Sequence, residues 1–318
     1  MLNWSTFTSY LSDSSDTPQW DTPAGSVDTF LLVEVTCPPV NQTGKNPRQP
    51  AFSRTVAIIP ARYRSTRFPG KVLSEIAGKP MVLWVAERAV AAKTVERVII
   101  ATDDERVADL VVANGYEARI TRAEHPTGTD RVSEVARELA NVDIVVNVQG
   151  DEPLISPDTI DAAVNALKLN QEAGIATTWE PIADVSEVLS PDVVKIVVSD
   201  DGHAIYFSRS PVPFPRDAVI KYGSLEAALN EERDLIRQFK KHTGLYVYRR
   251  EVLLSFTTWR QSKLEELERL EQLRALENDV TIVATQAATA SIGVDTVADL
   301  RRVEALAQQL ESLQPGTL

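Results

Sequence analysis

Residues 55–71 read TVAIIPARYRSTRFPGK, and this stretch decides how the rest of the chain is interpreted. Its first part, Val56–Ile59, is apolar and stops at Pro60, which is typical of a buried strand that runs into a loop. Four cationic side chains follow among small polar residues, and they are Arg62, Arg64, Arg67 and Lys71. Because open α/β sheets bind ligands in loops at the carboxyl ends of strands, the stretch predicts an anion-binding loop.

Two other interpretations of this loop have to be considered. Basic loops are common on protein surfaces, where their charges are simply solvated. A P-loop for ATP or GTP is excluded, because Val72 follows Gly70-Lys71 and Ser65 stands where the first glycine of that motif belongs. The surface-loop interpretation is weakened by the rest of the chain, whose net charge is −12.

The composition is that of a globular protein with anionic character. The chain has 318 residues, of which 43% are hydrophobic and 25% charged, enough for one large α/β domain or two small ones. Its net charge argues against nucleic-acid or membrane partners, and an anionic substrate would need a local basic patch. The single cysteine, Cys37, forms no intramolecular disulfide, which is compatible with a cytoplasmic protein. Neither a transmembrane-length apolar run nor a zinc-type Cys/His cluster is present in the sequence.

Residues 1–52 differ in composition from the rest. They are rich in Ser, Thr, Asp and Pro, and the first basic residue is Lys45, so they match neither a secretory signal nor a transit peptide. This composition predicts a mostly disordered extension, with residues 53–318 as the folded domain. The alternative is that the true start codon lies nearer Val56.

From Thr55 onward, strand-like and helix-like segments alternate. Strands are expected at 56–59, 97–102, 117–120, 143–148, 193–199, 204–208, 244–249, 280–284 and 292–294. Helices are expected at 80–93, 105–114, 130–140 with Thr129 or Asp130 as cap, 157–169, 226–241 and 295–313, and a leucine stripe at helical spacing runs from Leu264 to Leu276. Such alternation predicts an α/β fold with a mostly parallel sheet covered on both faces.

Two acidic segments follow predicted strands. Gln149-Gly150-Asp151-Glu152-Pro153 ends the most apolar strand, where a carboxylate could bind Mg²⁺, although the same residues suit an ordinary turn. Gly293-Val294-Asp295-Thr296 repeats the arrangement, and there a plain helix cap is the simpler interpretation. Both carboxylates and the cationic loop would form a phosphoryl-transfer site if the fold brings them together, which sequence spacing does not show.

Two further segments carry polar or aromatic groups. HPTGTDR at His125–Arg131 runs into a helix start and could contact a base, ribose or phosphate, or serve only as a cap. HTGLYVYR at His242–Arg249 places His242, Tyr246 and Tyr248 on or near one strand, where aromatic residues usually serve packing.

Taken together, these segments resemble one protein family. The matching segments, in order, are Pro60–Lys71, Ile76–Met81, Ala101–Asp104, His125–Arg131, Asn147–Pro153, Tyr206–Pro213, His242–Arg249, Leu270–Arg274 and Gly293–Thr296. They are similar to the 3-deoxy-manno-octulosonate (Kdo) cytidylyltransferases, also called CMP-Kdo synthetases. The resemblance covers about residues 54–308, and the combined set of motifs is highly specific although several single motifs are weak.

The resemblance implies a fold and a reaction. The fold would be the nucleotide-diphospho-sugar transferase type, a Rossmann-like α/β fold with a mostly parallel sheet and a small dimerisation portion, so that residues 53–318 form the cytidylyltransferase domain. The reaction would be CTP plus Kdo giving CMP-Kdo plus diphosphate with Mg²⁺, for lipopolysaccharide or a related cell-surface glycan. The protein would be a cytoplasmic homodimer.

The resemblance also implies roles for individual residues. Arg62, Ser65, Arg67 and Lys71 would hold the triphosphate, with Arg131 and Gln149 near the nucleotide. Asp151 and Asp295 would bind magnesium, and Lys71, Asp151 and Arg62 would be the catalytic residues. The sugar acid would be contacted by His242, Tyr246, Glu271 and Gln272.

The sequence departs from the family pattern in places. The family usually has Ser-Pro-Leu-Glu before the late helix, whereas this chain has Ser262-Lys263-Leu264-Glu265, which puts the start of that helix in doubt. The stretch 217–241 matches poorly, so its contacts with the sugar are unassigned.

Two alternative functions remain open. One is transfer of CMP to another acidic sugar, such as 8-amino-Kdo or a sialic acid, although sialate enzymes usually carry a different, glycine-rich first loop. The other is a non-catalytic nucleotide-sugar binding protein, which would be expected to have lost Lys71, Asp151 or Asp295. All three residues are present.

Overall fold

The computed structural model describes residues 54–63 and 68–313. The predicted extension at 1–52 and the predicted triphosphate ligands Ser65 and Arg67 lie outside these residues. Among the described helices, none combines the length and the apolar character needed to cross a membrane.

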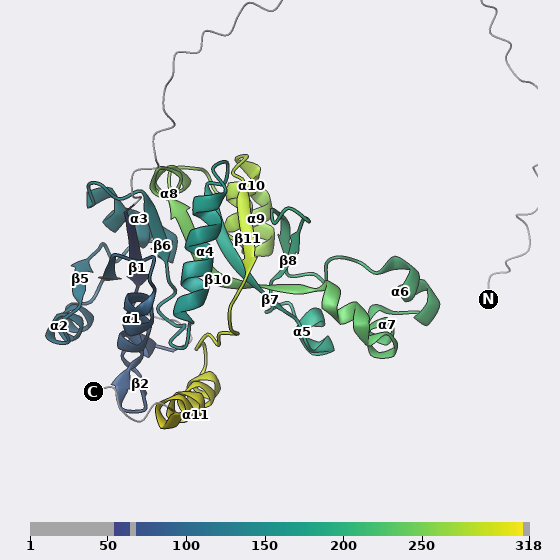
Figure 1. The fold of residues 1–318 in the computed structure, drawn as a ribbon, viewed down its shortest axis with the longest axis horizontal. Helices are drawn as coiled ribbons and strands as arrows, with labels where there is room; N and C mark the ends of the chain where they lie inside the picture. Colours follow the sequence, from purple (N-terminus) through teal and green to yellow (C-terminus); the bar gives the residue numbers. More distant parts are fainter. Residues whose placement is uncertain (1–53, 64–67, 314–318) are drawn as a thin grey trace, which may run out of the picture. The chain divides into compact units, whose positions relative to one another are not determined.

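One mixed sheet organises the described part of the chain (Figure 1). Its strands follow the order β11-β7-β10-β6-β1-β4-β5, and a hairpin of β8 and β9 pairs with β10. Their bounds are β1 Thr55–Pro60, β4 Arg97–Thr102, β5 Glu117–Ile120, β6 Ile144–Asn147, β7 Ile175–Pro181, β8 Lys195–Val198, β9 Ala204–Ser208, β10 Lys240–Arg249 and β11 Ile282–Gln286. A separate small hairpin joins β2 (Glu75–Ile76) to β3 (Lys79–Pro80).

The first half of the sheet is parallel, as predicted. β6, β1, β4 and β5 run in one direction, so the loops that follow them open at the same edge. β10 then inserts antiparallel between β6 and β7, and β7 pairs parallel with β11. The register of β10 against β7 shifts between His242 and Tyr246, which marks a bulge in that strand.

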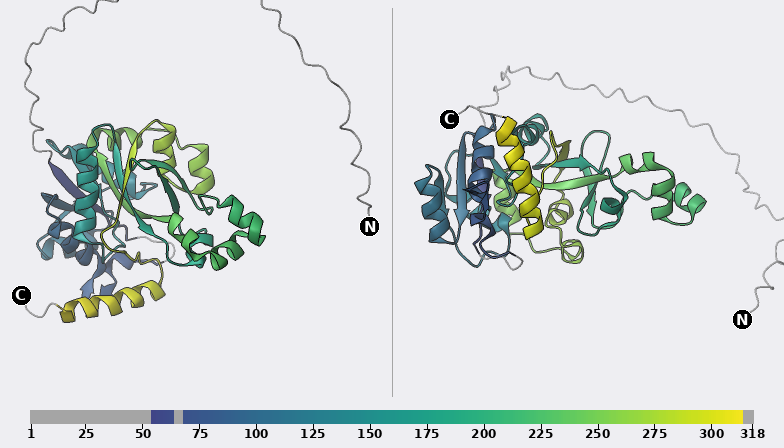
Figure 2. Two further views of the ribbon diagram at one scale, coloured as in Figure 1. Left: turned by 45° about the vertical axis from the view of Figure 1, so that its right-hand side comes forward. Right: turned by 90° about the horizontal axis from the view of Figure 1, so that it is seen from below.

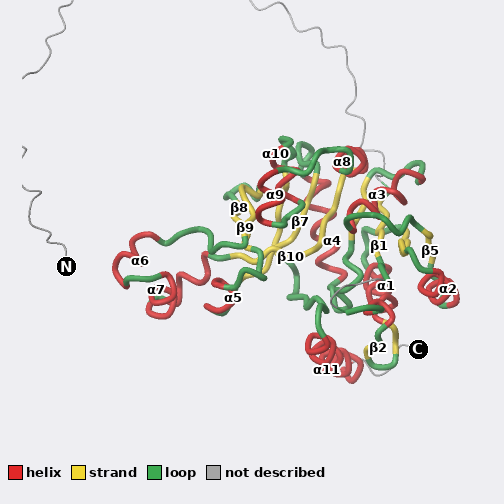
Figure 3. The backbone as a smooth tube through the Cα atoms, turned by 180° about the vertical axis from the view of Figure 1, so that it is seen from behind, coloured by secondary structure: helices red, strands yellow, loops and turns green. Residues whose placement is uncertain are grey.

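Helices cover both faces of the sheet, and the central strands β1 and β6 bury both of their faces. Along β1, Ala57 and Ile59 pack on the side of α1 (Met81–Ala91), α2 (Glu105–Ala113) and α4 (Pro157–Leu169). Val56 and Ile58 pack on the opposite side with α3 (Gly128–Glu138), α8 (Arg250–Phe256) and α10 (Gln272–Glu277). Figure 3 shows the two layers from behind. This alternation has the period of two expected of a β-strand.

The last helix, α11 (Val297–Leu313), packs beside the β2–β3 hairpin (Figure 2). Val294, Val303 and Ala307 form a small apolar core with residues from β2 and α1. This packing carries the segment before α11 back to the edge of the sheet where β1 and β6 end.

A second small core lies beyond the outer ends of β7 and β10 (Figures 1 and 3). Its helices are α5 (Val185–Leu189), α7 (Leu225–Glu231) and the 3₁₀ helix η2 (Arg233–Gln238). The helix α6 (Arg216–Tyr222) packs against α7 and has no buried residue. The prediction of one exposed helix at 226–241 is therefore wrong. Leu229, Ile236 and Phe239 turn inward into this core, which interrupts the helix, and β10 already begins at Lys240.

Other predictions of local structure also need correction. Residues 292–294 form no strand, and β7 was not predicted at all. The leucine stripe is split into α9 (Lys263–Glu268) and α10, because Arg269 adopts a left-handed conformation with φ 55°. Leu273 lies in the core, whereas Leu267 is 81% exposed.

The start of α3 also differs from its prediction. The helix begins two residues earlier than expected, because Thr127 is its cap and forms a capping box with Asp130.

Candidate active site

Lys71 is held at the site by the turn that closes the cationic loop. Gly70 has φ 72°, a left-handed conformation that glycine adopts without strain. Its N–H donates to the carbonyl of Tyr63 over 2.9 Å, and its carbonyl accepts from the N–H of Leu73 over 2.9 Å. Lys71 therefore starts the short η1 helix (Lys71–Leu73) in a fixed position.

The Lys71 ammonium binds both predicted aspartates. Its Nζ lies 2.6 Å from Oδ2 of Asp151 and 3.3 Å from Oδ1 of Asp295, and it also donates to the carbonyl of Val294 over 3.1 Å. The lysine side chain is 14% exposed, and the aspartate side chains are 31% and 46% exposed. The fold thus brings Lys71 of the cationic loop and both carboxylates together, which is the arrangement that a phosphoryl-transfer site requires.

Asp151 reaches this position through a close approach of two turns. A side chain at Gly150 would place its Cβ 2.7 Å from the carbonyl oxygen of Pro60, so only glycine lets the turn after β6 lie against the end of β1. The N–H of Val294 then donates to the carbonyl of Asp151 over 2.8 Å. That bond fixes the segment carrying Asp295 beside the turn carrying Asp151.

Asp295 is not the residue that caps α11. The Thr296 hydroxyl accepts from the N–H of Asp299 over 3.2 Å, and the Asp299 carboxylate accepts from the N–H of Thr296 over 2.9 Å. The reciprocal cap therefore involves Thr296 and Asp299. The helix-cap interpretation of the segment 293–296 therefore holds for Thr296 and not for Asp295.

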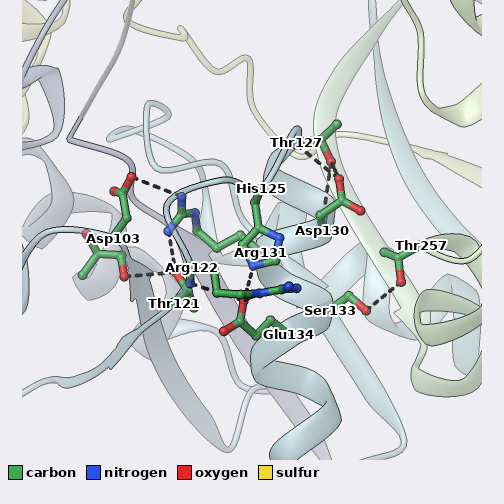
Figure 4. A network of polar contacts seen from close by, with 11 residues as sticks. Asp103, Thr121, Arg122, His125, Thr127, Asp130, Arg131, Ser133, Glu134 and Thr257 are labelled. Atoms are coloured by element: carbon green, nitrogen blue, oxygen red, sulfur yellow. Dashed lines mark hydrogen bonds and ion pairs between the residues drawn. The ribbon is translucent and has the colours of Figure 1, made fainter.

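Two further arginines lie at the same edge of the sheet. Arg62 follows β1 and donates from Nη1 to the carbonyl of Pro126 over 3.3 Å. Arg131, on α3, is fully buried, donates from Nη1 to the Thr121 hydroxyl, and has Nη2 3.4 Å from a carboxylate oxygen of Asp103. Figure 4 shows Asp103 and Thr121 on one side of the Arg131 side chain.

These guanidinium groups are incompletely satisfied. Among the described residues, Nη2 of Arg62 and Nε of Arg131 are buried without a hydrogen-bond partner, and Nη2 of Arg131 has only the 3.4 Å ion pair with Asp103, which lacks hydrogen-bond geometry. Burial lowers the pKa of Arg131, Asp103 opposes that shift, and the charge of nearby Arg62 adds to it. Arg131 is buried, Arg62 is half-buried, and both have unused N–H groups, which favours an anion that binds both, because an unsatisfied buried donor is costly.

The loop before Arg131 is fixed by its own polar contacts. His125 and Arg122 both contact the carboxylate of Glu134, in the second turn of α3 (Figure 4). The predicted polar loop is thus held against α3 by side-chain contacts. Among its residues, Arg131 extends toward Asp103 after β4 and Thr121 after β5.

The turn after β6 also contacts β10. The Gln149 amide donates to the Gly244 carbonyl over 3.3 Å and lies 3.4 Å from Oδ1 of Asn147. The turn that carries Asp151 is therefore tied to the strand that carries His242 and Tyr246.

Glu152, next to Asp151 in the same turn, has a raised pKa. Burial, followed by the charges of Asp151 and Glu180, raises that pKa to about 7.

Three of the four predicted sugar ligands lie together on the α3 face of the sheet. The His242 ring lies 5.2 Å from the Tyr246 ring and packs edge-on against Phe207 at 5.0 Å. Glu271 is close enough to raise the pKa of Tyr246, after the larger effect of burial. Gln272 is 5% exposed and begins α10 directly after Glu271.

His242 is neutral in this environment. Burial lowers its pKa to about 3. Its Nε2 is 2.8 Å from the Thr177 hydroxyl, which itself donates to the Leu245 carbonyl over 2.7 Å. Because that hydroxyl has only one proton, Nε2 must be the donor, which leaves Nδ1 as an acceptor.

Comparisons with known proteins agree with this geometry. A family model described as cytidylyltransferase matches residues 56–282. A 3-deoxy-manno-octulosonate cytidylyltransferase of Geobacter metallireducens is 50% identical over 250 residues, which are 79% of this chain and 96% of that protein. The enzyme of the same name from Syntrophotalea carbinolica is 47% identical over 249 residues, 78% of this chain and 96% of that protein.

The chain belongs to the 3-deoxy-manno-octulosonate cytidylyltransferase family. A solved structure of a CMP:2-keto-3-deoxy-manno-octonic acid synthetase complexed with CTP is similar, with a TM-score of 0.73 and 40% identity over 81% of this chain and all of that chain. A 4-diphosphocytidyl-2C-methyl-D-erythritol synthase of Anaerococcus prevotii shares the fold alone, with a TM-score of 0.53 and 13% identity over 81% of this chain and all of that chain. The predicted family and fold class are confirmed.

The departure from the cytidylyltransferase family pattern at Lys263 does not disturb the fold. Ser262 caps α9 and forms a capping box with Glu265, so the helix begins at Lys263 without the usual proline. Asp103 and Glu152 are contributors to the site that were not singled out in the sequence. Asp103 directly follows β4, and Glu152 lies in the turn after β6, next to Asp151; these positions are the only local signal that could have indicated them.

Proposed function

We propose that this chain transfers CMP from CTP to the anomeric hydroxyl of 3-deoxy-manno-octulosonate and releases diphosphate. The observation that carries the proposal is the meeting of Lys71, Asp151 and Asp295 at the sheet edge where Arg62 and Arg131 keep buried N–H groups without a hydrogen-bond partner. The arrangement combines unsatisfied cationic donors for phosphate oxygens with paired carboxylates for a divalent cation. Membership in a cytidylyltransferase family supports the same assignment.

The donor set fits Mg²⁺. Asp151 and Asp295 offer carboxylate oxygens. The Val294 carbonyl accepts a hydrogen bond from the same Lys71 ammonium that pairs with both carboxylates. No cluster of three or more His, Cys, Asp or Glu side chains suited to a metal occurs among residues 54–63 and 68–313. Two carboxylates suffice, because Mg²⁺ keeps several waters and takes further ligands from substrate phosphates.

The protein groups divide the work along the triphosphate. Arg62 and Arg131 bind phosphate oxygens through the N–H groups that the protein leaves unused. The sugar hydroxyl attacks the α-phosphorus and a new P–O bond forms. The bond from the α-phosphorus to the bridging oxygen breaks, diphosphate leaves with that electron pair, and the hydroxyl proton passes to water. Lys71 neutralises charge on the departing diphosphate. A bound Mg²⁺ would supply Lewis-acid stabilisation of the phosphate oxygens.

On this proposal the sugar acid lies against His242 and Tyr246. The neutral His242 presents Nδ1 as an acceptor for a sugar hydroxyl and does not act as a cation for the sugar carboxylate. Glu271 and Gln272 approach from α10. Gln149 joins this side to the triphosphate side through its bond to Gly244.

The proposal includes a homodimer in the cytoplasm. Phe214 and Ile220, beside and within α6, are 60% and 65% exposed, and such apolar side chains on a projecting element suit contact with a second copy. The cytoplasm is where the nucleoside triphosphate substrate is available. Light scattering of the purified protein measures the mass, and a monomer at micromolar concentration would contradict the dimer.

A pyrophosphate-release assay tests the function. The protein is supplied with each of four nucleoside triphosphates, with Mg²⁺, and with Kdo, 8-amino-Kdo or a sialic acid. We expect release only when CTP, Kdo and Mg²⁺ are present together. Faster release with another sugar acid would reassign the acceptor, and CTP binding without release with any sugar would indicate a binding protein.

A further inference from the structure

All three protons of the Lys71 ammonium are used inside the protein. One points to Asp151, one to Asp295 and one to the Val294 carbonyl, at 2.6, 3.3 and 3.1 Å. An ammonium has only three donors, so Lys71 cannot bind a phosphate oxygen without giving up at least one of these bonds. The role proposed for Lys71 on the triphosphate therefore requires it to leave a carboxylate.

The ammonium also occupies the position where a cation would bind the two carboxylates. Both aspartates direct an oxygen at Nζ of Lys71, and the Lys71 side chain is 14% exposed. A divalent cation that bound the same oxygens would lie within about 4 Å of that positive charge. Repulsion between a dication and an ammonium at about 4 Å weakens binding roughly thirtyfold even at the dielectric constant of water.

We infer that Lys71 closes the two-aspartate site to free divalent cations, and that the site accepts a cation only together with a nucleoside triphosphate. The triphosphate oxygens take over the Lys71 donors, which leaves the carboxylates to the cation. This inference rests on the proposed function, because it assigns the same three residues to a metal–nucleotide complex. It adds an order of binding, in which the cation and the nucleotide enter together.

The surroundings of Lys71 explain why the triphosphate can release it. Arg62 and Arg131 keep unsatisfied N–H groups at the same edge of the sheet, so a polyanion is attracted there before Lys71 moves. Once phosphate oxygens are bound, Lys71 exchanges a carboxylate partner for a phosphate partner and stays charge-paired. A free cation brings no such replacement and leaves the ammonium beside a dication.

Binding of Mn²⁺ to the full chain, without nucleotide or sugar, tests the inference. The readout is the free Mn²⁺ signal in electron paramagnetic resonance, so no catalytic turnover is needed. We expect Lys71→Met to bind one Mn²⁺ at least about tenfold more tightly than the unchanged protein. In Lys71→Met/Asp151→Asn this gain should be lost, because one of the two carboxylates is gone.

Lys79→Met is the matched control. Lys79 also forms an ion pair, at 2.8 Å with Glu87, but away from both aspartates. Its Mn²⁺ affinity should equal that of the unchanged protein. Lys71→Gln repeats the test with a polar side chain, and thermal unfolding of every variant identifies one that does not fold.

Two results would overturn the inference. One is equal Mn²⁺ affinity of the unchanged protein and both folded Lys71 variants. The other is a gain in Lys71→Met that persists when Asp151 is also replaced. Failure of the proposed function is distinguishable, because it would appear in the pyrophosphate assay of the unchanged protein and not in this comparison.

Discussion

Replacing Asp151 by asparagine should separate catalysis from stability. The carboxylate lies 2.6 Å from the Lys71 ammonium, with the side chains 31% and 14% exposed. A pair of this kind contributes about 1 kcal/mol at the dielectric constant of water and about 4 kcal/mol at an effective value of 20. We expect the lower figure, because the asparagine oxygen can still accept a hydrogen bond and Lys71 keeps Asp295 and the Val294 carbonyl.

The effect on the reaction should be much larger. The substitution removes one of the two negative charges available to a divalent cation, and such a cation is worth several kcal/mol to phosphoryl transfer. A loss of about 3 kcal/mol corresponds to about a hundredfold lower kcat/KM. The melting temperature should fall by only about 2 to 4 °C, as expected for about 1 kcal/mol in a domain of this size.

The assay combines pyrophosphate release with thermal unfolding of the same samples. Asp158→Asn is the matched control, since Asp158 is an exposed carboxylate in the first turn of α4. It should keep the activity of the unchanged protein. Asp151→Asn with full kcat/KM would refute the reasoning, and so would a loss of activity that merely follows unfolding.

Three other substitutions test separate parts of the site and fold. Arg131→Lys should weaken CTP binding in calorimetry about tenfold or more, because an ammonium lacks the planar fork, whereas the exposed Arg122→Lys should not; equal affinity of both variants would contradict this. His242→Asn should remove an acid sensitivity: the fold keeps His242 neutral down to about pH 3 while the unfolded chain is protonated near pH 6.5, so stability falls as the pH drops through that window. Between pH 7.5 and 5.0, urea unfolding should show about 2 kcal/mol more loss in the unchanged protein than in the variant, and identical losses would refute the low pKa. Lys263→Pro should raise the free energy of unfolding by about 0.4 to 1 kcal/mol, because it occupies the first position of α9 after an extended Ser262; a decrease would show that the helix does not begin there.

The first half of the fold could be predicted because its signals are local. The bounds of β4 and β5 agree with the predicted segments 97–102 and 117–120, since each strand is a short apolar or mixed run between clear breaks. The start of α3 was misplaced because Thr127, Thr129 and Asp130 all suit a cap, and only the reciprocal bonds of Thr127 and Asp130 decide between them.

The second half could not be predicted in the same way. Residues 226–241 carry helix-forming charges, but Ile236 and Phe239 pack into a separate small core that no local pattern reveals. The strand β7 is paired on both sides, by β11 and β10, but its buried Thr177 and Glu180 give it a polar sequence that does not indicate a strand. Tertiary burial decides both cases against local preference.

The candidate site, like the fold, could be predicted from the sequence only in part. Each motif around Lys71, Asp151 and Asp295 could be recognised alone, but a helix cap was the simpler explanation for the segment that carries Asp295. What brings the three together is the close approach at Gly150 and the bond from Val294 to Asp151, both of which join distant parts of the chain. From the sequence, only the family resemblance implies that the three residues act together.

In the proposed mechanism, Asp151 and Asp295 together hold one cation on one triphosphate. A crystal grown with Mn²⁺ and CTP, measured at a wavelength where manganese scatters anomalously, tests this most directly. We predict an anomalous peak bonded to a carboxylate oxygen of each aspartate and to phosphate oxygens, with Lys71 moved onto the triphosphate. A peak bonded to neither aspartate, with CTP in place, would contradict the account.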